Sequence, residues 1–159
     1  MVENPTGHRP SHNRPKLPSR LKRMAIGARL RRLNMGKERI EVEGGKTYGP
    51  YSPGVKANGV VWLAGQIAPE AGDDISSQTA ACLEKIDALL AAAGVSKNEA
   101  CFVQVLLDDI ADFAAMNEVY STWVGEMEIP PARAAFEVAA LPRDSKVEIV
   151  VQAIEQNCC

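Results

Sequence analysis

The chain has 159 residues, of which 46% are hydrophobic and 24% are charged, a composition typical of one globular domain with a sizeable core. No apolar run approaches the roughly 20 residues of a membrane-spanning helix, so we expect no membrane partner. The net charge of −2 hides an asymmetry: residues 1–39 carry eleven Lys or Arg and two acids, a net +9, and the remainder carries −11. Such a split predicts a basic extension attached to an acidic domain.

Residues 1–37 are predicted to be a basic, disordered N-terminal extension. The segment contains four prolines and both histidines, and it has too few apolar side chains to offset the entropy cost of ordering. Residues 24–35 could form a short basic amphipathic helix. Three interpretations stay open: an organelle transit peptide, a nucleic-acid-binding arm, or an extension without function, with Met24 or Met35 as the true start. We expect a cytoplasmic protein, or a mitochondrial or plastid one if the segment is a transit peptide.

Residues 38–156 form the predicted folded domain, which begins with two strands. Residues 39–43 alternate in polarity and end in a Gly-Gly turn, and residues 60–67 are an apolar strand. Asn58-Gly59, just before the second strand, is a strong hairpin signal. Gly65 is unfavourable inside a strand, so we expect it to mark a bulge or a close approach to the backbone.

Two helices and a strand follow. Apolar residues at helical spacing predict a helix that begins near Asp73-Asp74 and ends at Gly94. Residues 100–107 are a predicted strand, and Asp108-Asp109 precede a second helix. The apolar stripe of the second helix consists of Phe113, Met116, Asn117, Tyr120 and Val124. Asn117 is the only amide on it, and we expect this amide to bond a nearby backbone group and fix a loop.

Arg133 is predicted to be the first residue of the next strand. Pro130 and Pro131 stop the preceding element, and residues 134–138 have strand character. An arginine at the open end of a strand is commonly a surface charge. A planar, always ionised fork beside an apolar strand is also suited to hold a carboxylate in two-point contact.

The last predicted strand, residues 146–154, contains an acid. Strict alternation puts Val147, Ile149, Val151 and Ala153 on one face and Glu148 among apolar residues on the other. Burying this carboxylate is costly unless it is paired or protonated. Glu148 therefore lies either at a sheet edge on the surface or in the lining of a cleft.

The predicted element order is strand, strand, helix, strand, helix, strand, strand. This order indicates an α+β fold, with a sheet covered on one face by two helices. The other face keeps apolar residues, and self-association would cover it.

The domain lacks the motifs of several enzyme classes. There is no G-x-G-x-x-G and no phosphate loop, the four cysteines have no CxxC or metal-ligand spacing, and His8 and His12 both lie in the extension. We therefore predict no metal site and no histidine-based hydrolase triad. The candidates for chemistry are Arg133, Glu148, Tyr51, Tyr120 and the cysteines.

Six short motifs occur in the order and spacing of one known family. They are Gly49-Pro50-Tyr51-Ser52, Gly65-Gln66-Ile67, Asn117-x-x-Tyr120, Pro131-Ala132-Arg133, Leu141-Pro142-Arg143-Asp144 and Val147-Glu148-Ile149. Each motif is weak alone, and six in order are specific. Over about residues 40–155 the chain resembles the RidA/YjgF/UK114 family.

This resemblance implies a chorismate-mutase-like α+β fold and a homotrimer with sites at the clefts between subunits. It also implies hydrolysis of 2-imino acids, or of their 2-aminoacrylate-type enamine precursors, to 2-oxo acids and ammonia without a cofactor. The implied partners are a small imino or oxo acid and further copies of the chain.

The resemblance also implies roles for single residues. Arg133 matches the family arginine that clamps the substrate carboxylate, and Glu148 matches the acid that places or activates water. Tyr51 matches an aromatic residue of the pocket lining, and Gly65 matches a glycine whose backbone faces the substrate.

Four further positions match the family less directly. Asn117 and Pro142 match positions with a structural role. Ala64 stands where many deaminating members have Ser or Thr, and Ala135 where many have Cys, so two polar contacts to the substrate are missing. Losing one such hydrogen bond costs about 0.5–1.5 kcal/mol, which would weaken activity roughly tenfold or shift the substrate towards a larger or more apolar side chain.

Other functions stay open. A module that binds a small carboxylate, such as a 2-oxo acid, without turnover is slightly favoured by the two alanines. A ribonuclease or translation inhibitor is an activity of some relatives, but the domain has no histidine and a charge of −11, whereas phosphate binding requires positive charge. Nucleic acid would therefore bind only through the basic extension. Chaperone-like holding of unfolded chains would leave no mark in the sequence.

Overall fold

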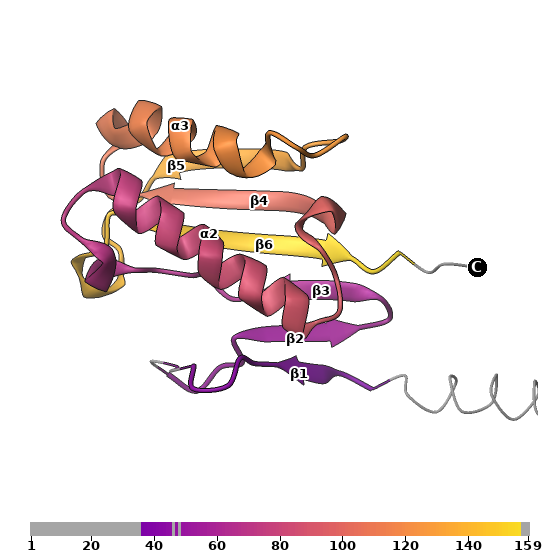
Figure 1. The fold of residues 1–159 in the computed structure, drawn as a ribbon. Coiled ribbons are helices and arrows are strands. Elements are labelled where there is room, and N and C mark those ends of the chain that lie inside the picture. Colours follow the sequence, from indigo (N-terminus) through magenta and orange to yellow (C-terminus); the bar gives the residue numbers. More distant parts are fainter. Residues whose placement is uncertain (1–35, 46, 48, 157–159) are drawn as a thin grey trace, which may run out of the picture. The chain divides into compact units, whose positions relative to one another are not determined.

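The structure, a computed structural model, describes residues 36–45, 47 and 49–156 of the chain (Figure 1). Its strands are β1 (Glu38–Ile40), β2 (Gly54–Ala57), β3 (Val60–Leu63), β4 (Ala100–Leu107), β5 (Ala132–Glu137) and β6 (Val147–Ile154). Its two α-helices are α2 (Ile75–Ala92) and α3 (Phe113–Val124). The predictions made for residues 1–35, including the helix over 24–35, lie outside the described residues.

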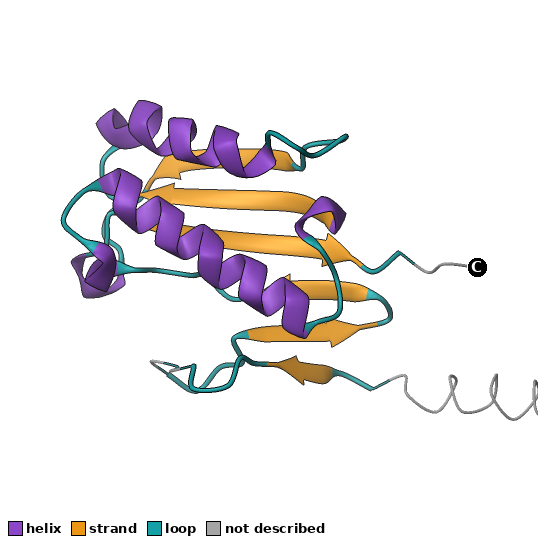
Figure 2. Ribbon diagram, in the orientation of Figure 1, coloured by secondary structure: helices purple, strands orange, loops and turns teal. Residues whose placement is uncertain are grey.

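The six described strands form one mixed sheet in the order β1-β2-β3-β6-β4-β5. Only β4 and β5 run parallel among the described pairs, and the others are antiparallel. Both helices cover the same face of the sheet (Figures 1 and 2). The prediction of an α+β fold with two helices on one face is therefore confirmed.

The core lies between the sheet and the helices. The side chains of Val147, Ile149, Val151 and Ala153 on β6 are fully buried, as the alternation predicted. Their neighbours on β4, Val103 and Val105 among them, are fully buried as well. Residues at these positions therefore mark the face of the sheet that the helices cover.

Asn58 and Gly59 form the predicted hairpin turn between β2 and β3. Both residues have positive φ, 51° and 77°, as a two-residue hairpin of this hand requires. The predicted element order did not count β2, although the turn signal implies a strand on each side of it. The predicted strand over 60–67 is too long, because the regular strand ends at Leu63 and only Gln66 pairs with β6 again, in an isolated bridge to Ile149.

Helix α2 begins and ends where its capping residues predicted. The Asp74 side chain accepts a hydrogen bond of 2.8 Å from the Ser77 backbone N–H, and Gly94 follows the helix with a φ of 75°.

The stripe predicted for α3 is partly wrong. Met116 and Tyr120 are buried as expected, but Phe113 is 37% exposed and Trp123 is buried in its place. Trp123 faces α2, where its indole N–H donates a hydrogen bond of 2.9 Å to Asp87 Oδ1. Contact with α2 therefore rotates the buried face of α3 away from Phe113.

The other face of the sheet carries exposed apolar side chains. Trp62 is 42%, Phe136 40% and Ile154 51% exposed. The strand register places all three on the face opposite the buried core residues, which the helices do not cover. The expectation that one sheet face stays apolar and uncovered agrees with the structure.

Candidate active site

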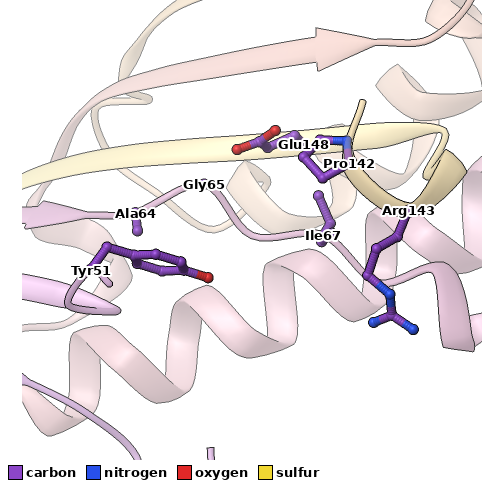
Figure 3. A pocket seen from close by; sticks show the side chains of 7 residues that line it. All are labelled: Tyr51, Ala64, Gly65, Ile67, Pro142, Arg143 and Glu148. Atoms are coloured by element: carbon purple, nitrogen blue, oxygen red, sulfur yellow. The ribbon is translucent and has the colours of Figure 1, made fainter. Parts of the chain in front are cut away.

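A pocket of about 370 Å³ lies around Glu148 (Figure 3). Strand β6 supplies Glu148, the loop before β2 supplies Tyr51, and the segment after β3 supplies Ala64, Gly65 and Ile67. The 3₁₀ turn Pro142–Asp144, just before β6, supplies Pro142 and Arg143 on the other side of the pocket. The structure thus brings together Tyr51, Ala64, Gly65 and Glu148 of the predicted site.

Gly65 lies directly against the Glu148 carboxyl group. A Cβ atom added at Gly65 would stand 1.7 Å from Glu148 Oε1, a distance that no side chain tolerates. Two backbone hydrogen bonds between Gln66 and Ile149, of 2.9 and 3.0 Å, hold the segment that contains Gly65 alongside β6. The predicted close approach at Gly65 is confirmed, and the approaching group is the acid itself.

Glu148 is an internal residue of the sheet with an unusual environment. Strand β6 lies between β3 and β4, so the interpretation of Glu148 as an edge residue is wrong and the cleft interpretation agrees with the structure. Burial raises the pKa of its carboxyl group above the ordinary value, because the charged form loses hydration. No described basic side chain forms an ion pair with it. A carboxylate of raised pKa is the stronger base towards a water molecule.

Arg133 lies under α3 and is half-buried. Its Nη2 donates a hydrogen bond of 2.8 Å to Asn117 Oδ1. Its Cζ lies 4.4 Å from the centre of the Tyr120 ring and 5.7 Å from that of Phe113. The prediction that the Asn117 side chain bonds a backbone group and fixes a loop is therefore wrong, because its oxygen accepts from the guanidinium instead. Strand β5 begins at Ala132, one residue before the predicted start at Arg133.

Arg133 and Glu148 lie on opposite faces of the sheet. Arg133 pairs with Val103, whose side chain is buried on the helix-covered face, and Ala135 pairs with Val105 on that same face. Glu148 is the neighbour of Leu106, which alternates with those valines and points to the other face. A single chain therefore does not bring Arg133 or Ala135 into the pocket.

Ile67 and Arg143 were not predicted from the sequence to lie in the pocket, and Pro142 was expected to have a structural role only. Arg143 and Asp144 have positive φ, 58° and 54°, which is uncommon for side chains other than glycine and frequent near functional sites. The Arg143 guanidinium points away from Glu148 (Figure 3), and its Nη1 lies 4.0 Å from Glu70 Oε2. Its place in the Leu-Pro-Arg-Asp motif was the only signal in the sequence.

A second cavity of about 430 Å³ adjoins the first and shares Tyr51, Gly65 and Ile67 with it. Its cation, Lys85, is already engaged, because Nζ donates to the Ile67 carbonyl at 2.7 Å and pairs with Glu70. The cavity around Glu148 is therefore the better candidate, since its acid has no such partner.

The remaining candidates for chemistry lie outside this pocket. Cys82 is buried, and burial raises the pKa of its thiol to about 12, so the nucleophilic thiolate does not form at neutral pH. Cys101 is exposed and Tyr120 lies beneath Arg133. Among the described residues no group of three or more His, Cys, Asp or Glu side chains is arranged to hold a metal ion. No described helix is both long and apolar enough to cross a bilayer.

Comparison with known proteins places the chain in a family. Residues 44–155 match the family model described as endoribonuclease L-PSP. A RutC family protein of Pyrococcus horikoshii is 45% identical over 117 residues, covering 70% of this chain and 91% of that protein. A mouse protein named 2-iminobutanoate/2-iminopropanoate deaminase is 37% identical over 114 residues, covering 67% of this chain and 82% of that protein.

The fold agrees with a solved structure of the same group. The crystal structure of Escherichia coli TdcF with bound serine superposes with a TM-score of 0.69 at 34% identity, covering 75% of this chain and 99% of that chain. The chain therefore belongs to the RidA/YjgF (RutC, endoribonuclease L-PSP) family and has its chorismate-mutase-like α+β fold.

Proposed function

We propose that the protein hydrolyses reactive 2-imino acids, and their 2-aminoacrylate-type enamine precursors, to 2-oxo acids and ammonia. The observation that carries this proposal is the Glu148 carboxyl group held in a pocket against the Gly65 backbone, where only a glycine leaves room for it. One water molecule adds to the imine carbon, the carbon–nitrogen bond breaks, and the nitrogen leaves as ammonia with the two protons of the water and its own. The water oxygen becomes the carbonyl oxygen of the 2-oxo acid.

Glu148 places the attacking water in this mechanism. Its raised pKa makes Glu148 a better proton acceptor than an ordinary carboxylate. The imine carbon is already electrophilic, so the attacking water needs little further activation. Tyr51, Ala64 and Ile67 give the pocket apolar walls for the side chain of the substrate. The methyl group of Ala64 in place of a hydroxyl favours larger or more apolar side chains.

The Arg133 that grips the substrate carboxylate comes from a second copy of the chain. Support comes from the opposite faces on which Arg133 and Glu148 lie, since only another copy can bring the two together. The exposed apolar face with Trp62 and Phe136 gives such a copy a surface to cover. Ala135 lies two residues from Arg133 on the same face and would enter the shared site with it. A homotrimer with three shared sites satisfies these requirements.

The relatives support the same chemistry. The mouse relative is named for 2-iminobutanoate and 2-iminopropanoate, and TdcF is a structure with bound serine. Serine carries a carboxylate and a nitrogen on one carbon atom, as a 2-imino acid does.

The proposal is tested by generating 2-iminobutanoate with an amino-acid oxidase and following its decay. We expect the wild-type protein to accelerate the decay, and Arg133→Ala to remove most of the acceleration. Arg143→Ala is the matched control, because Arg143 is the guanidinium that lines the pocket within one chain. If the imine decays no faster with the wild-type protein than with Arg133→Ala, the proposal is overturned. If only Arg143→Ala loses activity, Arg143 and not Arg133 binds the substrate carboxylate.

Ala64 also favours a second candidate function, a module that binds a small 2-oxo acid without turnover, because the pocket lacks a hydroxyl at that position. Affinity for 2-oxobutanoate combined with no acceleration of imine decay would decide for it.

A further inference from the structure

The Arg133 guanidinium is held by one face of α3. Phe113, Asn117 and Tyr120 are spaced four and three residues apart, so their side chains project from the same side of the helix. The Tyr120 ring lies 4.4 Å from Cζ, and Asn117 Oδ1 accepts from Nη2 at 2.8 Å. Among the described residues, the contacts with Arg133 thus involve an aromatic face and a hydrogen-bond acceptor, and no charge of opposite sign.

We propose that Asn117 and Tyr120 are positioning residues that preset Arg133 for its carboxylate ligand. This inference rests on the proposed function. A guanidinium offers a carboxylate two forks, one formed by Nη1 and Nη2 and one formed by Nε and Nη2. Each fork uses a different hydrogen of Nη2. Asn117 accepts one of these two hydrogens, so it blocks one fork and leaves the other for the ligand, whichever hydrogen it takes.

Tyr120 acts through its ring and not through its hydroxyl group. The residue is 5% exposed, its ring stacks at a tilt on Trp123, and its hydroxyl oxygen has no hydrogen-bond partner among the described residues. A cation over such a desolvated ring is attracted electrostatically to the face of the ring. Because the guanidinium is planar, it can also stack on that face. The two contacts together restrict the rotation of the Arg133 head group before any ligand binds.

The first test uses the full-length protein without ligand. Restricted rotation about the Cζ–Nε bond separates the side-chain nitrogen signals of Nη1 and Nη2 in NMR spectra. We expect separate signals for Arg133 in the wild-type protein and in Asn117→Asp, which keeps the acceptor, and a single averaged signal in Asn117→Ala. Separate signals that persist in Asn117→Ala would overturn the role of the amide.

The second test measures the Kd for 2-oxobutanoate, the product of the proposed reaction. We expect Tyr120→Phe to leave Kd unchanged and Asn117→Ala and Tyr120→Leu each to raise it about threefold to tenfold. Ile86→Ala is the matched control, because it truncates a fully buried side chain of α2, outside the face of α3 that holds Arg133. It should lower stability and leave Kd unchanged.

These outcomes separate the two proposals. If the wild-type protein binds 2-oxobutanoate with this pattern but hydrolyses no imine, the proposed function fails and the positioning role stands. If Kd is the same in Asn117→Ala and Tyr120→Leu as in the wild type, or if the wild type does not bind, the positioning role is overturned, whatever the turnover. Should Tyr120→Leu not fold, Asn117→Ala decides.

Discussion

The contact between Gly65 and Glu148 would be disrupted by one additional atom, a Cβ at position 65. The carboxyl group occupies the space in which any other residue would place its Cβ. Position 65 therefore admits only glycine for as long as Glu148 keeps its place, and the two residues depend on each other.

We predict that Gly65→Ala displaces the Glu148 carboxyl group. The displaced atoms are the end of a flexible side chain, so we expect only a small loss of stability. Misplacing a catalytic group, in contrast, costs on the order of 100-fold in rate. Imine decay and thermal unfolding measure both effects. Gly36→Ala is the control, because a Cβ at Gly36 meets nothing within 4 Å. Full activity of Gly65→Ala would show that the placement of Glu148 does not matter.

The raised pKa of Glu148 predicts a pH dependence of stability. The native state holds its proton at higher pH than the unfolded state does, so the free energy of unfolding falls as pH rises from about 4.3 towards the raised pKa. Glu148→Gln removes this loss. In urea unfolding at fixed protein concentration, we expect the stability of Glu148→Gln relative to the wild type to increase from pH 4 to pH 7. A difference that shrinks or stays constant would contradict the raised pKa.

At the residue scale, the features predicted from the sequence were those that depend only on local pattern, such as a glycine position or the alternation of side chains along a strand. The close approach at Gly65 was predicted, although the strand in which it was expected ends at Leu63. Strict alternation separated Glu148 from the core. The sequence did not predict the hydrogen bond between Asn117 and Arg133 or the position of Arg143, because these depend on how distant elements meet. Nor did it predict that Arg133 and Glu148 lie on opposite faces, since this follows from the register of β4 with both neighbouring strands.

Among the elements, α2 has the most clearly defined start. Asp74 caps it, and the Ser77 backbone hydrogen bond lowers the pKa of the Asp74 carboxyl group. We predict that Asp74→Ala lowers the thermal unfolding temperature, because an N–H of the first turn loses its acceptor. The difference from the wild type should be largest above the ordinary carboxyl pKa and vanish as pH falls through the lowered pKa.

Asp73→Ala is the control for the cap, because Asp73 is the exposed acid next to Asp74 and does not receive the Ser77 hydrogen bond. Equal losses in the two variants would mean that negative charge near the helix start, and not the cap, is what stabilises α2.

Long elements with a clear period were predictable, and short ones and buried faces were not. Helix α2 and strands β4 and β6 span several periods of their patterns, so their bounds were predicted closely. Strand β2 has four residues, only two periods of strand alternation, and it forms because β1 and β3 pair with its two edges. The buried face of α3 depended on its contact with α2, which its own periodicity does not contain.

At the scale of the whole molecule, the apolar face around Phe136 is central. Phe136, Leu106 and Glu148 are neighbours across β5, β4 and β6, so this surface leads directly to the acid of the pocket. We predict that the wild-type protein sediments as a trimer and that Phe136→Asp sediments as a folded monomer without imine hydrolysis, because a buried charge would oppose assembly.

Glu84→Lys, a charge change at an exposed position of α2, should leave both the assembly and the activity unchanged. Monomeric wild-type protein with full activity would exclude a site shared between copies.

Mixing two inactive variants tests most directly whether one site takes Arg133 and Glu148 from different copies. Arg133→Ala and Glu148→Gln are denatured, combined in equal amounts and refolded together, with each variant refolded alone as the control. A trimer with shared sites pairs an intact Arg133 with an intact Glu148 in about one quarter of its sites, so about one quarter of wild-type imine hydrolysis should return. A mixture as inactive as its components, although trimeric, would contradict the shared site.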